Sequence, residues 1–110
     1  MKYRTLLFLL LTIPAMTWAE KTISHIEQAN SYERSYNKSK LEMNNIYREM
    51  QKYMPMSEIS RFNSVQAKWV AYRNANCQYY GRHIASQMEC LENMNIARIK
   101  EMRQILDGYK

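Results

Sequence analysis

Glycine and proline are nearly absent from this sequence: each occurs only twice in 110 residues. β-Sandwiches and barrels need many tight turns, and Rossmann and P-loop sites need clustered glycines, so both classes are disfavoured. The chain is 46% hydrophobic and 24% charged, which argues against a disordered tail or a membrane bundle. These features predict a single all-α domain.

The N-terminal segment has the pattern of a secretory signal peptide. A basic start and a short apolar run precede Pro14 and the small residues Thr17 and Ala19. The apolar run is too short to span ~30 Å of hydrocarbon, which disfavours an uncleaved anchor. We therefore expect residues 1–19 to be a signal peptide cleaved after Ala19. Residues 20–110 should then form one periplasmic or secreted domain without a membrane anchor.

Cleavage changes how the basic charge is interpreted. The segment carries Lys2 and Arg4 and no acidic residue, so its removal lowers the net charge from +6 to +4. A basic balance permits nucleic acid as a partner. In this chain, however, lysines and arginines alternate with glutamates, which is typical of an ordinary solvated helix surface. We therefore expect no nucleic-acid binding.

Both cysteines, Cys77 and Cys90, follow the expected cleavage site. In an oxidising compartment they allow one intramolecular disulfide, and the alternative is a pair of free or intermolecular thiols. His83 lies between them, but three ligands at these spacings fit no closed zinc site. We expect the disulfide, no metal and no cofactor.

Apolar residues at spacings of three and four predict three helices, at about 24–53, 57–80 and 86–107. We expect them to pack as a small three-helix bundle. The two cysteines each lie about one turn from the second bend. A disulfide there would link the second and third helices.

Local residues suggest where these helices begin and end. Pro55 should end the first helix, because proline cannot donate the helical hydrogen bond. Ser57 is a good N-cap for the second helix, and Gly81 is its expected stop. Ser86 and Glu89 have the spacing of a capping box at the start of the third. The Met54-Pro55-Met56 segment also resembles a copper(I) methionine pair, but a turn with two core methionines is the favoured interpretation.

The spacing predicts one apolar stripe on each helix. In the order of the chain, the stripes contain Tyr32, Tyr36, Ser39, Met43, Tyr47, Met50 and Met54; Phe62, Val65, Trp69, Tyr72, Asn76 and Tyr80; and Leu91, Asn95, Arg98, Met102 and Ile105. We expect Trp69 to be largely buried at the centre. Its expected neighbours are Tyr36, Met43, Tyr47, Phe62, Leu91 and Met102.

Polar side chains interrupt two of these stripes. Gln66, Arg73 and Asn76 fall in the apolar sector of the second helix, and Asn95 and Arg98 in that of the third. Buried amides and guanidinium groups are costly unless they are hydrogen-bonded. The structural interpretation is that they bond to each other, to tyrosine hydroxyls, to main-chain carbonyls or to Glu89, Glu92 and Glu101. The functional alternative is that both arginines open onto a cleft and bind an anionic group of a partner.

The segment from Gln66 to Cys77 resembles the Q-x-x-W-x-x-Y-R-[DN]-x-x-C motif of the LprI-type lysozyme inhibitor N-terminal domain family. Two further motifs are similar and occur in the same order: residues 43–47 resemble L-N-x-x-Y, with Met43 in place of leucine, and residues 90–98 resemble C-L-x-x-x-T-x-x-R, with Asn95 in place of threonine. The residues assigned to the family motif are Asn44, Tyr47, Gln66, Trp69, Tyr72, Arg73, Asn76 and Arg98. The chain departs from the family in lacking a second cysteine pair, in Asn74 where aspartate is common, and in Gly81-Arg82 where Gly-Ser is common.

The resemblance implies a small exported helical protein, and the family name implies inhibition of a lysozyme or another cell-wall hydrolase. No nucleophile has a base at a recognisable spacing, so we expect a non-enzymatic binding protein. Arg61 and Arg82 are the candidate cations for contact with a hydrolase's carboxylate pair. Animal lysozymes are usually basic, however, and a +4 partner would be repelled at long range. The alternatives are a structural or envelope-stress module, or an immunity protein against a wall-targeting toxin.

Overall fold

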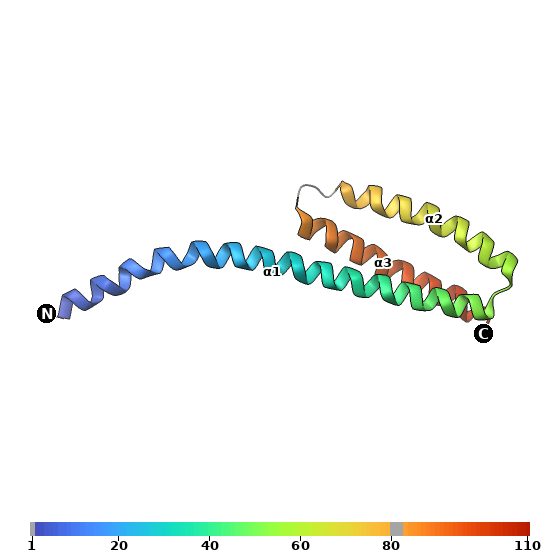
Figure 1. The fold of residues 1–110 in the computed structure, drawn as a ribbon, viewed down its shortest axis with the longest axis horizontal. Helices are drawn as coiled ribbons and strands as arrows, with labels where there is room; N and C mark the ends of the chain where they lie inside the picture. The colour runs from blue at the N-terminus through green and yellow to red at the C-terminus, as the bar shows by residue number, and fades with distance from the viewer. Residues whose placement is uncertain (1, 80–82) are drawn as a thin grey trace.

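The computed structural model contains three helices: α1 (Lys2–Tyr53), α2 (Met56–Gln78) and α3 (Ile84–Asp107). It describes the backbone of residues 2–79 and 83–110, and the side chains of 27, 28, 30–79 and 83–110. In Figure 1, α2 and α3 form an antiparallel pair beside the C-terminal half of α1. The described residues contain no strand, so the prediction of an all-α three-helix fold is confirmed.

α1 is much longer than predicted. It runs without interruption from Lys2, so the expected start near residue 24 is wrong, and Pro14 does not break the helix. No glycine occurs in this stretch, and its leucine-rich start has high helix propensity. The helix has 52 residues, and its N-terminal half extends beyond α2 and α3 (Figure 1). A helical N-terminal segment is compatible with signal cleavage, which stays a prediction.

The start of α2 also differs from the prediction. Pro55, rather than Ser57, occupies the N-cap position, and the helix has no side-chain cap. The Pro55 carbonyl accepts the N–H groups of Glu58 and Ile59, each at 3.0 Å. The fixed φ of proline positions that carbonyl, and the first turn forms without a serine cap. At the other end α2 stops at Gln78, and the expected stop at Gly81 lies outside the described residues.

α3 begins at Ile84, two residues before the predicted capping box. His83 is the N-cap, with an extended backbone and no side-chain cap, so Ser86 does not start the helix. The N–H of Gln87 donates to the His83 carbonyl at 3.1 Å, which makes the first helical bond one turn earlier than expected. The C-terminal end at Asp107 is as predicted.

The apolar core lies at one end of the bundle, where the end of α1, the start of α2 and the end of α3 meet (Figure 1). Four of the buried core residues are methionines, whose unbranched, flexible side chains can fill the irregular space where three helices meet. Of the Met54–Met56 pair, Met54 is in the core and Met56 is exposed, so the prediction of two core methionines is half right. The buried members of the core are Met43, Ile46, Met50, Met54, Phe62, Ile99, Met102 and Leu106.

The buried face of α2 is narrower than its predicted stripe. α1 packs mainly against α3, and α2 contacts α3 more than α1, so only one side of α2 is covered. Val65 is 55% exposed and Tyr72 63% exposed, which contradicts their assignment to the buried stripe. Trp69 is only partly buried and packs against the side of the core, so its predicted central position is wrong. Tyr80 lies outside the described residues.

The disulfide Cys77–Cys90 links α2 to α3, with a Cα–Cα distance of 5.5 Å, as the sequence predicted. It lies at the opposite end of the α2–α3 pair from the apolar core (Figure 1). The covalent bond therefore holds together the end of the pair that has few apolar contacts.

Among the described residues, none of the helices combines the length and the apolar character needed to cross a bilayer.

We predict that the double variant Cys77→Ala/Cys90→Ala loses about 3 kcal/mol of unfolding free energy, because the crosslink closes a loop of about 14 residues. Urea denaturation followed by circular dichroism measures the loss, and reduction of the unsubstituted protein should reproduce it. An unchanged midpoint in both experiments would show that packing alone holds α2 to α3.

Candidate functional site

A polar network crosses the bundle next to the apolar core, and Asn95 is at its centre. Asn95 is 0% exposed; its Oδ1 accepts a hydrogen bond from Arg73 Nη1 at 2.9 Å, and its Nδ2 donates to Ser39 Oγ at 3.0 Å. Ser39 in turn donates to the Tyr36 carbonyl at 2.6 Å. One side chain of α3 therefore links α1 and α2.

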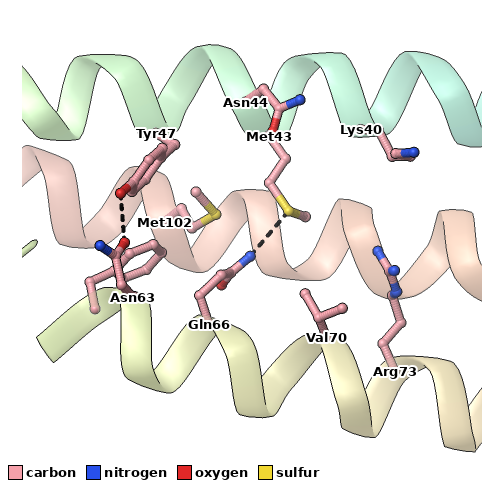
Figure 2. Close-up of a pocket in the computed structure, with 10 residues that line it drawn as sticks. Lys40, Met43, Asn44, Tyr47, Asn63, Gln66, Val70, Arg73 and Met102 are labelled. Carbon is pink, nitrogen blue, oxygen red and sulfur yellow. Dashed lines mark hydrogen bonds between the residues drawn. The ribbon is translucent and has the colours of Figure 1, made fainter. Parts of the chain in front are cut away.

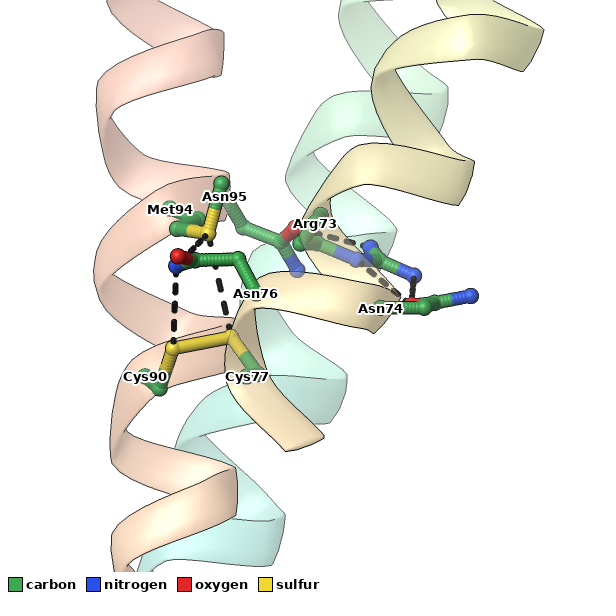
Figure 3. The surroundings of a disulfide bond; sticks show 7 residues. All are labelled: Arg73, Asn74, Asn76, Cys77, Cys90, Met94 and Asn95. Carbon is green, nitrogen blue, oxygen red and sulfur yellow. Dashed lines mark hydrogen bonds between the residues drawn. A yellow bond between two sulfur atoms is a disulfide. The ribbon is translucent and has the colours of Figure 1, made fainter. Parts of the chain in front are cut away.

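The guanidinium group of Arg73 donates hydrogen bonds to two side-chain amide oxygens. Besides Asn95, it uses Nε and Nη2 to donate to Asn74 Oδ1, at 3.1 and 2.9 Å (Figure 3). The residue is only 8% exposed. Among the described residues no carboxylate pairs with Arg73, so neutral oxygens take the place of water around a largely buried cation.

Arg98 forms a second connection across the bundle. It is 7% exposed, and its Nε donates to Gln66 Oε1 at 2.9 Å. Its Nη1 pairs with Glu101 at 2.8 Å, at the edge of the bundle. Gln66 Nε2 then approaches Met43 Sδ on α1 at 3.3 Å (Figure 2). This connection also touches all three helices.

Aromatic rings alternate with the two guanidinium groups. Arg73 lies 5.8 Å from the Tyr36 ring and 5.4 Å from the Trp69 ring, and Arg98 lies 5.8 Å from Trp69. The Phe62 ring is 5.4 Å from Arg98. Cation–π attraction is strongest where water is excluded. Trp69 therefore lies next to both cations, and it packs against the outside of the apolar core.

The structure confirms half of the predicted acceptor side chains, and among the described residues Asn76, Glu89 and Glu92 bond neither Arg73 nor Arg98. Gln66, Asn95 and Glu101 were all expected to hold an arginine, and each of them does. Asn74 was not expected to take part, although its place directly after Arg73 in the motif is a signal that could have indicated it. Ser39 was assigned to the stripe of α1 but not to this network. Its hydroxyl among apolar stripe residues is the sequence feature that could have indicated a buried hydrogen bond.

A groove of about 420 Å³ lies between α1 and α2, and Gln66 and Arg73 of this network form part of its lining (Figure 2). Four of the family-motif residues line it: Asn44, Tyr47, Gln66 and Arg73. Two of its polar side chains bond one another, since Tyr47 donates to Asn63 Oδ1 at 2.6 Å. The full lining is Lys40, Met43, Asn44, Tyr47, Phe62, Asn63, Gln66, Val70, Arg73 and Met102.

The remaining predicted residues are dispersed. Asn76 lies beside the disulfide, with Nδ2 3.3 Å from Met94 Sδ (Figure 3). Tyr72 faces outward, away from the network. Arg61 is exposed and lies 3.5 Å from Glu58. Arg82, the other candidate for partner contact, lies outside the described residues.

The groups best suited to catalysis or metal binding do not converge among the described side chains. Both cysteines are in the disulfide. Over the described side chains, no group of three or more His, Cys, Asp or Glu residues is arranged to hold a metal ion. The polar groups that do converge are amides, guanidinium groups and hydroxyls, whose role here is to bond the helices together.

This fold defines a small helical bundle linked by a disulfide and by buried arginines. A family model described as "Lysozyme inhibitor LprI" matches residues 17–102, which is more than half of the chain. The chain belongs to the LprI family. No curated protein and no solved structure matches it in the corresponding comparisons.

We predict that Arg73→Met lowers the unfolding free energy by about 1–3 kcal/mol, because the buried Asn95 Oδ1 loses its donor. Arg61→Met is the matched control; that side chain is exposed, so its effect should stay within about 0.5 kcal/mol. Denaturation midpoints measure both changes. Unchanged stability in Arg73→Met together with lost partner binding would make Arg73 a contact residue and not a structural one.

Proposed function

We propose that this chain is an exported, non-enzymatic binding protein that inhibits a lysozyme or a related cell-wall hydrolase by covering its substrate cleft. The match to the lysozyme inhibitor family over residues 17–102 carries the proposal. An immunity protein against a wall-targeting toxin would act in the same physical way. The two differ only in which hydrolase is bound.

The architecture supports a binding role because it is preorganised. The disulfide fixes one end of the α2–α3 pair, the apolar core fixes the other, and Arg73 and Arg98 join the helices between them. A rigid scaffold loses little conformational entropy when it binds a partner. The two arginines and both cysteines, which have the most reactive or strongly polar side chains, take part in internal contacts. Recognition of a partner is then left to the exposed surface.

Export is supported by two independent features. The first is the signal-peptide pattern of residues 1–19. The second is the Cys77–Cys90 disulfide, since such bonds persist in oxidising compartments and are rare in the cytosol. A wall hydrolase acts in the same exported space, so the proposed inhibitor and its target would meet there.

We predict that the purified, processed protein blocks at least one enzyme in a panel of acidic and basic muramidases. Lysis of a peptidoglycan suspension should fall in proportion to the inhibitor added and stop near a molar ratio of one. Runs at low and physiological salt separate specific binding from charge attraction. If a large molar excess leaves every enzyme at full rate under both conditions, the proposed function is wrong.

We also predict that the exported protein begins at Glu20 and is two hydrogens lighter than the reduced chain. Intact mass spectrometry of periplasmic or culture material reports both properties at once. Retention of Met1, or a mass with two free thiols, would contradict the proposed processing.

A further inference from the structure

The outward face of α2 carries three apolar residues that nothing in the bundle covers. Val65, Tyr72 and Tyr79 are 55%, 63% and 92% exposed. They are seven residues apart, which is two helical turns, so they lie along one side of the helix over about 21 Å. Lys68 and Ala75 lie between them and are also exposed. We call these five residues the outer face of α2.

Beyond Glu58, the sequence of α2 and of the turn that follows it carries formal charge of a single sign. Residues 59–88 contain no Asp or Glu but four basic residues, Arg61, Lys68, Arg73 and Arg82. Arg73 is held inside by amide oxygens, and Arg61 lies near Glu58. Lys68 is exposed, and within the described part of the chain it has no hydrogen bond or ion pair.

The surface formed by α1 and α3 is different, because it carries carboxylates as well as cations. Arg103 pairs with Glu42, and Lys110 lies 3.3 Å from Glu49. Such mixed-sign surfaces are well solvated and present no net field to a partner. The outer face of α2 instead presents tyrosine rings beside an unpaired cation.

We propose that the outer face of α2 is the surface that binds the hydrolase, and that it enters an acidic, carbohydrate-binding cleft. This inference rests on the proposed function. A glycoside hydrolase cleft contains a pair of carboxyl groups and binds sugar rings, which are polar at their edges and less polar on their faces. A tyrosine has a comparable character, with an apolar ring and one hydroxyl, and it loses little entropy when fixed. Tyr72 and Tyr79 would occupy sugar positions, and Lys68 would pair with a carboxylate.

Charge complementarity favours this occupant over the alternatives. A second copy of the chain would bring another carboxylate-free, basic surface against this one, which opposes association. An anionic lipid surface also accepts tyrosine rings at its interface, and an assay of binding to anionic vesicles distinguishes it from an enzyme cleft. A cleft that combines carboxylates with sugar sites uses both features.

The test measures dissociation constants of the full processed protein for a muramidase that it inhibits. Tyr72→Ala and Lys68→Glu are the test variants. Tyr53→Ala and Lys100→Glu are matched controls, because they make the same changes at exposed positions on α1 and α3. We expect each test variant to raise the Kd at least about tenfold and each control less than about twofold. All four should keep the wild-type denaturation midpoint.

A second measurement locates the contact on the enzyme. A soluble chitin oligosaccharide that fills the cleft should compete with the inhibitor. Lowering the pH to protonate the enzyme's carboxylates should weaken binding of the unsubstituted protein more than that of Lys68→Glu.

The possible outcomes are distinct. If the unsubstituted protein inhibits no muramidase, the proposed function fails and this inference fails with it. If it inhibits and both test variants inhibit equally well, the function stands and the outer face of α2 is not the interface. Inhibition without oligosaccharide competition would place the contact outside the cleft. If the protein forms a dimer and Tyr72→Ala dissociates it, the outer face of α2 binds a second copy of the chain. If the protein binds anionic vesicles and Lys68→Glu abolishes that binding, the face binds a lipid surface. Either result would overturn the proposal.

Discussion

The buried amide of Asn95 is the interaction on which the rest of the bundle depends. It accepts from Arg73 on α2 and donates to Ser39 on α1, while its own backbone belongs to α3. A fully buried amide is stable only when its hydrogen-bonding groups have partners, so sliding any one helix against the others leaves a polar group unsatisfied. The network therefore favours one register of three helices whose apolar contacts alone are less specific.

The three kinds of stabilisation follow one another along the bundle. Methionines and branched aliphatic residues fill the end where all three helices meet, the arginine network occupies the middle, and the disulfide closes the far end. Most of the residues that resemble the family motif belong to this interior. The surface that we propose for recognition is the side of α2 that the interior leaves uncovered, where the motif residue Tyr72 is 63% exposed.

Much of this arrangement was predictable from the sequence. The scarcity of glycine and the three- and four-residue spacing gave the helices, the cysteine count gave the disulfide, and the polar residues on the stripes gave the arginine acceptors. Periodicity did not predict which side of α2 is covered, because that depends on where α3 lies, so Val65 and Tyr72 were assigned to the interior. Trp69 was placed at the centre for the same reason, since the partial cover of α2 leaves its ring against the outside of the core. The helix starts were missed because Pro55 and His83 open their helices without side-chain caps.

A double-mutant cycle between Arg73 and Asn95 tests the central claim most directly. The unfolding free energies of Arg73→Met, Asn95→Leu and the combined variant give the coupling between the two side chains, free of their separate packing losses. Our account predicts a favourable coupling of about 1–3 kcal/mol, because the second substitution removes a partner that the first has already left unsatisfied. Additive losses, with a coupling below about 0.5 kcal/mol, would show that the buried network does not hold the helices in register.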